Sequence, residues 1–398
     1  MKTDTAELKE ILLHKGVADI LPNQGYLEKL LSEDKRLTIY AGFDPTAPTL
    51  HIGHTIQLRK LRHFQDLGHK IIFLVGDFTA RIGDPDKLSA RKPLTEREIK
   101  TNLKLYKKQA GKFIRFSGKN AAVIKFNNSW LGKMKFADVL ELASHMTVDQ
   151  MLKRDMFARR IKEEKPIYIH EFMYPLMQGY DSVSMNVDGE VGGNDQLFNM
   201  MAGRTLMKAL KNKEKFVITT KLLEDSTGAK MGKTTGNMIS LIDAPEDMYG
   251  KIMSWTDGLI VPGFELCTDY TPHQVAVIED ELKHGINPRD IKMRLAFEIV
   301  RLCTNEKKAQ TAEEAFVSSF QKKETHENIP EIKGAGRTLE VLLIEENIIA
   351  SKGEVRRLAE SNAFTNFETK EVLTAAQTKE IVVPGIYKIG KRVIVRVI

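Results

Sequence analysis

Residues 36–76 contain two apolar stretches separated by a segment with helical periodicity, and this succession limits the folds open to the chain. The first stretch, RLTIYAGF (36–43), alternates like a buried strand, and the second, KIIFLVG (70–76), is a continuous apolar strand. Between them, residues 50–68 repeat apolar side chains at helical spacing. Two strands joined through a helix predict an open α/β sheet with parallel strands, in which ligands bind beyond the carboxyl ends of the strands.

The loop before this helix, DPTAPTLHIGHTI (44–56), carries His51 and His54 on either side of Gly53. Two histidines three residues apart share one helical face, so a zinc site is one interpretation and a pair of surface histidines is another. Zinc needs three or four ligands, and the two cysteines lie far apart, so we expect no metal site. The Gly-x-Gly-x-x-Gly pattern is absent from this turn, which argues against a nicotinamide cofactor.

The composition is that of a globular protein. With 398 residues, 42% of them hydrophobic, the chain can form two or three cores. No apolar run approaches the roughly eighteen residues of a membrane span, and MKTDTAELKE at the start lacks the apolar core of a signal peptide. Two cysteines, Cys267 and Cys303, suit a reducing compartment, so we expect a cytoplasmic protein without a membrane partner. The net charge of +7 is compatible with a polyanionic partner such as RNA, although soluble enzymes reach this value without one.

Further along the chain, AAVIKFN (121–127) and KFVITT (215–220) have the composition of additional strands. Helical segments around 136–163 and 170–180 lie between them, which predicts a helical insertion in the sheet. From about 245 to 322 helical spacing replaces the strands, HENIPEIKGAGRT (326–338) is typical of a linker, and the last sixty or so residues form short β runs. We therefore expect a catalytic domain over 1–240 with an insertion near 130–165, a helical domain over 241–325, a linker over 326–336 and a small domain over 337–398.

The stretch KMGKTTGN (230–237) follows the last strand of the predicted sheet and carries Lys230 and Lys233. A flexible loop with two lysines suits a mobile clamp on phosphates, because each lysine is a point charge on a long stem. A solvated surface loop is the alternative.

Together these two stretches resemble the signatures of class I aminoacyl-tRNA synthetases, a His-Ile-Gly-His tetrad and a Lys-Met-Ser-Lys-Ser loop. The tetrad is complete at 51–54, whereas the loop has Gly232 and Thr234 at the serine positions and keeps both lysines. A Gly-Lys-Thr version is familiar among tyrosyl-tRNA synthetases. The resemblance implies an α/β fold: a Rossmann-like parallel sheet with a helical insertion, then an α-helical domain and a small α+β RNA-binding domain.

In this class of enzyme an amino-acid carboxylate attacks the α-phosphorus of ATP and pyrophosphate leaves. The carboxylate is already ionised, so catalysis needs no general base and consists of positioning and of stabilising the charge on the leaving group. A helix N-terminus offers amide donors and a positive dipole end for that purpose. The resemblance implies ATP and Mg²⁺ as cofactors; it assigns catalysis to Thr46, His51, His54, Lys230, Lys233 and Thr234, and ATP binding to His51, His54, Gly53, Gly193, Asp195, Lys230, Met231 and Lys233.

A polar face follows in EFMYPLMQGYD (171–181), where Tyr174, Gln178 and Asp181 are spaced by four and three residues. These spacings place them on one side of a helix. A core helix would be apolar there, so either a binding pocket or simple surface exposure accounts for them. Tyr40 lies toward the end of the first strand and is expected at the same pocket.

Two more acids have both a functional and a structural interpretation. Asp84 in GDFTARIGDP precedes a proline, which is ordinary turn chemistry. Asp195, in VGGNDQLFN with Gln196, is also suited to cap a helix. The resemblance to tyrosyl-tRNA synthetases implies that Tyr40 and Asp181 bind the phenolic hydroxyl of L-tyrosine, that Asp84, Tyr174 and Gln178 hold its ammonium group, and that Asp195 and Gln196 meet the ribose and the tyrosyl moiety. The stretch GGNDQ departs from the more frequent Gly-Gly-Ser-Asp-Gln.

The C-terminal segment resembles the α-L RNA-binding motif. Residues 351–398 hold nine Lys and Arg against five Glu, and SKGEVRRLAESNAF supplies a basic helix, although a solvated face would have the same composition. NAFTNFETKEV departs from the glycine-rich turn of the motif. We expect tRNA(Tyr) to contact Lys208, Lys211, Lys352, Arg356 and Arg357.

The resemblance also implies a homodimer formed through the insertion, where MTVDQMLKRDMF (146–157) is expected to supply apolar surface. Three alternatives remain: a tryptophanyl-tRNA synthetase, which would not need Tyr40 and Asp181; a small-molecule nucleotidylyltransferase with the His-x-Gly-His motif, which would lack the RNA-binding tail; and a non-catalytic RNA-binding relative, against which the intact histidines and lysines argue.

Overall fold

The computed structural model of the chain describes residues 4–84, 94–224, 238–320, 331–334, 336–346, 348–349, 351–361, 363–366, 369, 371–390 and 393–398. The chain divides into two compact units, Met1–Phe316 and Val317–Ile398. No helix within these described ranges is long and apolar enough to cross a membrane.

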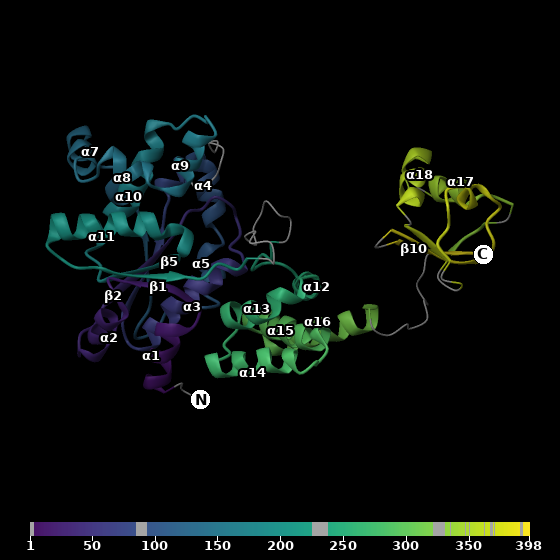
Figure 1. The fold of residues 1–398 in the computed structure, drawn as a ribbon, viewed down its shortest axis with the longest axis horizontal. Helices are drawn as coiled ribbons and strands as arrows, with labels where there is room; N and C mark the ends of the chain where they lie inside the picture. Colours follow the sequence, from purple (N-terminus) through teal and green to yellow (C-terminus); the bar gives the residue numbers. More distant parts are fainter. Residues whose placement is uncertain are drawn as a thin grey trace. The chain divides into compact units, whose positions relative to one another are not determined.

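A six-stranded sheet with the order β1-β6-β5-β2-β3-β4 forms the centre of the first unit (Figure 1). Its strands are β1 Val17–Leu21, β2 Thr38–Phe43, β3 Lys70–Val75, β4 Val123–Phe126, β5 Gly189–Gly193 and β6 Phe216–Thr220. All neighbouring pairs are parallel except β1 and β6, which are antiparallel. The sheet is therefore the expected parallel one with an antiparallel edge strand. The sequence predicted neither this edge strand, β1, nor the inner strand β5.

The predicted strand-helix-strand unit is present as β2, α3 Ile52–Asp66 and β3, in register from Thr38 opposite Lys70 to Phe43 opposite Val75. The helices cover both faces of the sheet, because right-handed crossovers that run in opposite directions from β2 place their helices on opposite sides. Helices α10 Ile169–Met185 and α11 Leu197–Lys211 pack together on one side, and α1 Thr5–His14 and α3 lie on the other (Figure 1). The first unit also contains α2 Gln24–Ser32, α4 Glu96–Leu103 and α5 Tyr106–Ala110.

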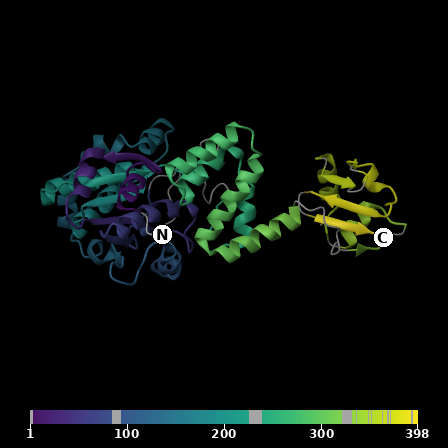
Figure 2. The same cartoon turned by 90° about the horizontal axis from the view of Figure 1, so that it is seen from below.

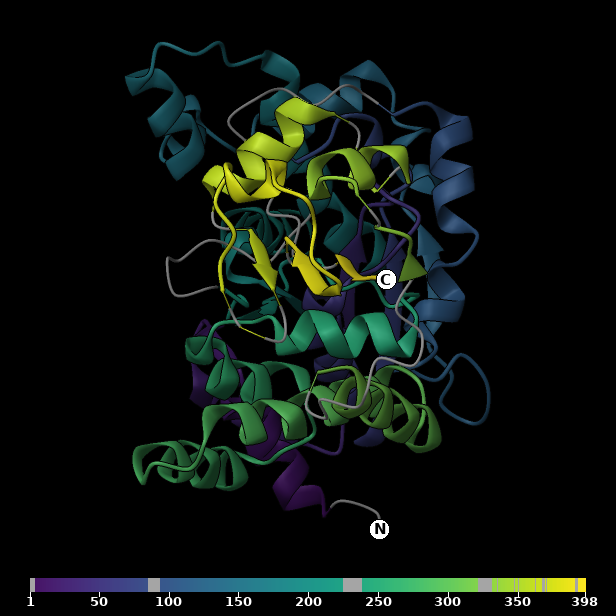
Figure 3. The ribbon, with the colours of Figure 1, turned by 90° about the vertical axis from the view of Figure 1, so that its right-hand side faces the viewer.

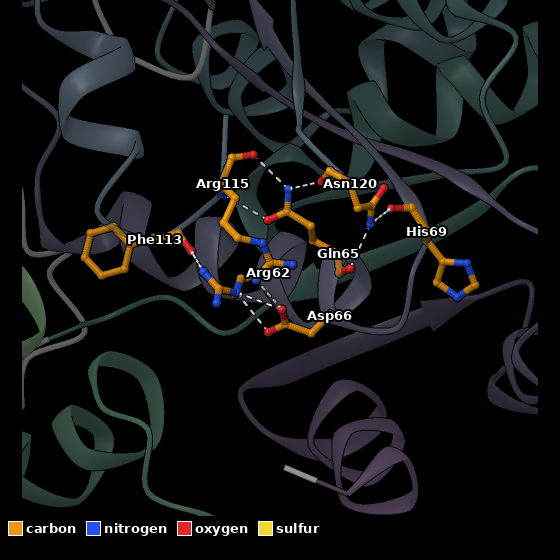
Figure 4. Close-up of polar contacts among 7 residues, drawn as sticks. All are labelled: Arg62, Gln65, Asp66, His69, Phe113, Arg115 and Asn120. Carbon is orange, nitrogen blue, oxygen red and sulfur yellow. Dashed lines mark hydrogen bonds and ion pairs between the residues drawn. The ribbon is translucent and has the colours of Figure 1, made fainter. Parts of the chain in front are cut away.

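The C-terminal end of α3 is tied to the segment before β4 by side-chain hydrogen bonds (Figure 4). Gln65 donates to the carbonyl oxygens of Arg115 and Asn120 at 2.8 and 2.7 Å, and it accepts from the Arg115 amide at 2.9 Å. Asn120 in turn donates to the carbonyl oxygens of Gln65 and His69 at 2.9 and 3.0 Å. These bonds satisfy part-buried backbone groups of an irregular segment and so connect α3 to the segment that leads into β4.

The helical insertion is built from several short helices rather than one long one: α6 Asn128–Leu131, α7 Phe136–Ala143, α8 Val148–Leu152 and α9 Asp155–Lys162. The expectation that MTVDQMLKRDMF supplies an apolar surface is largely wrong, because Met151, Met156 and Phe157 are buried within the chain itself. Only Val148 of its apolar side chains is strongly exposed.

From Pro245 onward the first unit is helical, with α12 Pro245–Met253, α13 Ile260–Cys267, α14 Pro272–Lys283, α15 Pro288–Cys303 and most of α16 Glu306–Phe320 (Figure 2). Side chains from these helices, including Ile252, Phe264 and Leu295, belong to the same hydrophobic core as Leu61 and Phe64 of α3. The helical segment is therefore packed directly against the sheet domain.

The second unit has its own core and a four-stranded sheet with the order β7-β10-β9-β8 (Figure 3). Its elements are β7 Glu331–Ile332, α17 Leu339–Glu345, α18 Lys352–Glu360, β8 Phe364–Asn366, β9 Gly385–Ile389 and β10 Val393–Val397. The basic helix expected in SKGEVRRLAESNAF is present as α18. Strand β7 lies inside the stretch expected to be a linker and pairs in parallel with β10.

Candidate active site

A cavity of about 380 Å³ opens where β2, β3, β5 and β6 end. This is the edge of the sheet at which ligands were expected. It is lined by these residues from the sequence interpretation: Tyr40, Thr46, His51, Gly53, His54, Asp84, Tyr174, Gln178, Asp181, Gly193, Asp195 and Gln196. The structure thus brings together residues that are up to 156 positions apart, from Tyr40 to Gln196.

The remaining expected residues fall into two groups. Lys230, Met231, Lys233 and Thr234 lie outside the described residues. Lys208 and Lys211 are exposed on α11, and Lys352, Arg356 and Arg357 are exposed on α18 of the other unit.

The two histidines cap the N-terminus of α3. His51 is the N-cap residue, and its Nδ1 accepts from the Gly53 amide at 3.2 Å. Nδ1 of His54 accepts from the His51 amide at 3.0 Å. An Nδ1 atom that accepts a backbone hydrogen bond carries no proton, so each neutral ring holds its proton on Nε2. A β-carbon at position 53 would lie 3.0 Å from the His51 ring, so the glycine lets that ring fold over the helix start.

Tyr40 and Asp181 form the buried end of the cavity. Tyr40 is fully buried, and its hydroxyl lies 2.9 Å from Ser182 Oγ. Asp181 is 2% exposed and accepts from Trp130 Nε1 at 2.8 Å and from Asn127 Nδ2 at 3.2 Å. Burial raises the pKa of Asp181 well above its usual value, and the two hydrogen bonds oppose that shift. The alternative that this helical face is exposed to solvent is wrong for Asp181.

Tyr174 is also buried, on the same face of α10. Its hydroxyl donates to Asp44 Oδ2 at 2.8 Å, and Thr79 Oγ1 donates to Asp44 Oδ1 at 2.7 Å. Burial, followed by the neighbouring Asp44 and Asp84 carboxylates, raises the pKa of Tyr174 well above its ordinary value. Tyr174 is therefore held neutral as a hydrogen-bond donor.

Asp84 is the centre of a second polar cluster. It pairs with Arg154 Nη2 at 2.7 Å and accepts from Gln196 Nε2 at 2.7 Å and from Asn199 Nδ2 at 3.4 Å. Asp195 lies in the 3₁₀ turn Asn194–Gln196, and no side-chain cap bond is formed at the start of α11. Asp84 is therefore more than a turn residue, and Gln196 is directly linked to it.

Several cavity or supporting residues were missed by the sequence interpretation: Asp44, Thr79, Asn127, Trp130, Arg154, Ser182, Glu190 and Lys215. One signal was available, since Lys215 directly precedes the apolar residues Phe216 to Ile218 of β6. Within the described parts of the chain no group of three or more His, Cys, Asp or Glu is arranged to hold a metal ion.

The sequence of this chain is similar to a protein family and to proteins of known function. The family model described as tRNA synthetases class I (W and Y) matches residues 32–321. The tyrosine–tRNA ligase of Thermotoga maritima is 43% identical over 358 residues, covering 89% of this chain and 88% of that ligase. The tyrosine–tRNA ligase of Mannheimia succiniciproducens is 41% identical over 388 residues, covering 97% of both chains.

Two solved structures have the same fold. A C-terminally truncated mitochondrial tyrosyl-tRNA synthetase from Coccidioides posadasii superposes with a TM-score of 0.62 at 26% identity, covering 78% of this chain and 91% of that one. The tyrosyl-tRNA synthetase of Archaeoglobus fulgidus, solved with L-tyrosine, has a TM-score of 0.61 at 22% identity, covering 78% of this chain and all of the other. With the tetrad at the mouth of α3, these matches assign the chain to the class I tRNA synthetases, in the family of the tyrosine–tRNA ligases.

Proposed function

We propose that this cavity carries out both steps of the tyrosine–tRNA ligase reaction. L-tyrosine and ATP form tyrosyl-adenylate and pyrophosphate, and the tyrosyl group is then transferred to the 3′ end of tRNA(Tyr) with release of AMP. The observation that carries the proposal is that the expected tyrosine and ATP residues within the described part of the chain converge on one cavity at the carboxyl ends of the strands.

The tyrosine side chain is proposed to enter with its phenol toward Tyr40 and Asp181. Both are buried, so a ligand hydroxyl there replaces water as their partner, and a ligand without it leaves them desolvated. Asp84, Tyr174 and Gln178 are proposed to hold the ammonium group, since they offer a carboxylate, a phenol and an amide at the cavity wall. A buried carboxylate placed to accept a hydrogen bond from a phenol hydroxyl favours tyrosine over tryptophan.

ATP is proposed to lie over the start of α3. The Nε2–H groups of His51 and His54 and the helix N-terminus are donors for the phosphate oxygens, while Thr46 lines the same wall. Gly193 and Asp195, at the end of β5, are proposed to meet the ribose. The tyrosine carboxylate oxygen then bonds to the α-phosphorus as the bond to pyrophosphate breaks, and no proton has to move in this step.

Outside the described residues, Lys230, Met231, Lys233 and Thr234 are proposed from the sequence to close over the leaving pyrophosphate. Mg²⁺ is proposed to arrive bound to the phosphates of ATP rather than in a protein site. The described residues contain no cluster that would hold it.

The second unit is proposed to bind tRNA through Lys352, Arg356 and Arg357 of α18, with Lys208 and Lys211 of α11 as additional phosphate contacts. A cytoplasmic location is proposed as well, because Cys267 and Cys303 are both free thiols buried in the core, which suits a reducing compartment.

We further propose that the chain dimerises through the insertion and the start of α10. Large apolar side chains are exposed there: Phe136, Leu140, Val148, Ile161 and Ile169, with exposures from 52% for Ile161 to 80% for Ile169. Exposed apolar groups gathered on one segment are typical of a protein interface.

Pyrophosphate exchange with each of the twenty amino acids tests the central proposal. We expect exchange with tyrosine alone at low substrate concentration, followed by charging of tRNA(Tyr). Exchange that depends on tryptophan, or nucleotidyl transfer that does not depend on any amino acid, would replace it.

A further inference from the structure

A buried ion pair lies behind the tyrosine end of the cavity and has no role in the mechanism above. Lys215, directly before β6, is fully buried, and Glu190 of β5 is 2% exposed and lines the cavity. Lys215 Nζ donates to Glu190 Oε2 and, at 3.0 Å, to Ser182 Oγ. Removing two charges from water costs as much as the pairing returns, so such a pair is a poor source of stability and calls for another explanation.

Glu190 sets the orientation of Gln178. Gln178 Nε2 donates to Glu190 Oε1 at 3.2 Å. An ionised carboxylate only accepts hydrogen bonds, so the amide nitrogen of Gln178 must face Glu190. The carbonyl oxygen of Gln178 is then the end of the amide left for a ligand, and an oxygen acceptor is what an ammonium group requires.

Lys215 sets the direction of a second chain of hydrogen bonds. An ammonium group only donates, so Ser182 Oγ accepts from Lys215 and its own proton is turned away from the positive charge. The neighbour in that direction is the Tyr40 hydroxyl, 2.9 Å away. Tyr40 that accepts from Ser182 has its own proton to donate, either to Glu190, which also hydrogen-bonds it, or to a phenol oxygen that enters the cavity.

We propose that Lys215 and Glu190 are positioning residues for the amino acid, Lys215 acting through Ser182 and Tyr40 on the phenol, and Glu190 acting through Gln178 on the ammonium group. The inference rests on the proposed placement of tyrosine and deepens it. On this proposal one buried ion pair determines which atoms face the ligand: a hydroxyl donor at the phenol end of the pocket and a carbonyl acceptor at the ammonium end.

The chain Lys215–Ser182–Tyr40 and the pair Glu190–Gln178 should have different effects on pyrophosphate exchange. Ser182→Ala interrupts the first chain and should lower kcat/KM for tyrosine about three- to tenfold. The kcat/KM for phenylalanine, which has no hydroxyl, should be almost unchanged. Glu190→Gln frees the Gln178 amide to turn and should raise KM about tenfold or more for tyrosine and phenylalanine alike. Inhibition by 3-(4-hydroxyphenyl)propionate, which lacks the ammonium group, should stay the same in Glu190→Gln and weaken in Ser182→Ala.

Controls separate positioning from a loss of folding. Lys292→Met removes another buried lysine, which donates to Trp255 O at 2.6 Å and pairs with Asp257, and none of these residues lines the cavity. It should leave KM for tyrosine and the preference over phenylalanine unchanged, whatever its thermal stability. KM for ATP should be constant in all variants. The double variant Lys215→Met with Glu190→Gln, which leaves no unpaired charge, should fold and show both signatures.

Two outcomes have distinct meanings. If the wild-type protein fails to exchange pyrophosphate with tyrosine, the proposed function itself is overturned. Two results with an active wild type would overturn only the positioning role. One is that Ser182→Ala lowers the activation of tyrosine and of phenylalanine equally. The other is that Glu190→Gln weakens the binding of 3-(4-hydroxyphenyl)propionate as much as the binding of tyrosine.

Discussion

The rings of His51 and His54 lie with their centroids 3.9 Å apart at the N-terminus of α3. Each ring is held by a backbone amide on Nδ1, so the histidines have a structural role as helix caps, beside the chemical role proposed for them as Nε2 donors. These two roles are separable by substitution, because asparagine is a good N-cap but does not reach as far as an imidazole.

His51→Asn should therefore lower kcat for adenylate formation about a hundredfold, the effect of losing one preorganised donor, while KM for tyrosine stays constant. Its free energy of unfolding should be close to that of the wild type. His51→Ala should lose the same activity and in addition about 0.5 to 2 kcal/mol of stability. Single-turnover kinetics and urea unfolding measure the two effects, and wild-type single-turnover rates in His51→Asn would contradict the donor role.

Tyr40 and Asp181 should differ in their effect on selectivity, because one is neutral and the other ionises. Tyr40→Phe should cost about 0.5 to 1.5 kcal/mol in kcat/KM for tyrosine, and Asp181→Ala about 1.5 to 3 kcal/mol or more. Measuring kcat/KM for tyrosine and phenylalanine in both variants checks the order. An Asp181→Ala enzyme that keeps the wild-type preference would show that Asp181 does not bind the phenol.

Ile169 offers a test of the proposed dimer. Its side chain is 80% exposed, so Ile169→Glu should not perturb the folded protomer, but it would bury a charge in an interface at this surface. We expect sedimentation to show a monomer of 45.1 kDa for the variant and twice that mass for the wild type. Val383→Glu, at a side chain 68% exposed in the other unit, is the matched control and should remain dimeric. A monomeric wild type would contradict the proposal.

The C-terminal unit should contribute to tRNA affinity but not to amino-acid activation. A chain ending after Phe320 keeps α16 whole and removes β7 together with its partner β10, whereas a cut at Gly336 would leave β7 without that partner. Pyrophosphate exchange should be nearly unchanged and tRNA charging weaker. In the full chain, replacing Lys352, Arg356 and Arg357 with alanine should reduce the salt dependence of log Kd by roughly two to three units of slope. An unaltered slope would exclude these cations as phosphate contacts.

Lys15 should make the stability depend on pH. Burial, and then the charge of Arg59, lower its pKa to about 7, whereas an unfolded lysine keeps its usual value near 10.5. Between these two values the unfolded chain binds more protons than the folded one, so the free energy of unfolding rises with pH, by at most about 1.4 kcal/mol per pH unit. Below about pH 7 both states are protonated and the penalty is complete. Urea unfolding at about pH 7 and about pH 9 should show this gain in the wild type and a smaller one in Lys15→Met; equal gains would contradict it.

The central sheet and the position of the site could be predicted because their signals are local. The periodicity of apolar residues over 36–76 predicts β2, α3 and β3. The topology of an open parallel sheet then predicts a ligand site at the carboxyl ends of the strands. The edge strand β1 was missed, because VADIL is short and carries an aspartate and no alternation. Its pairing with β6 joins segments 200 positions apart, for which no local pattern exists.

The insertion shows the limit of composition as a guide. MTVDQMLKRDMF has enough apolar side chains for an interface, yet Met151, Met156 and Phe157 face the core of their own chain. The hydrophobicity of a side chain predicts that it is buried. It does not predict whether the side chain is buried in the core of its own chain or in an interface with another chain.

What the sequence by itself determined is the unit β2-α3-β3 with the further strands β4 and β6, the helix that begins at the two histidines, and the candidate residues for activating an amino acid. What only the tertiary structure decided is how those residues are held: Arg154 on Asp84, Asp44 on Tyr174, and Glu190 with Lys215 behind Gln178 and Tyr40. A charged residue in a sequence is expected at the surface, because burial of an isolated charge is so unfavourable. Its burial is tolerated only when folding brings a specific partner from a distant segment within hydrogen-bonding distance, and that encounter depends on the packing of the whole chain.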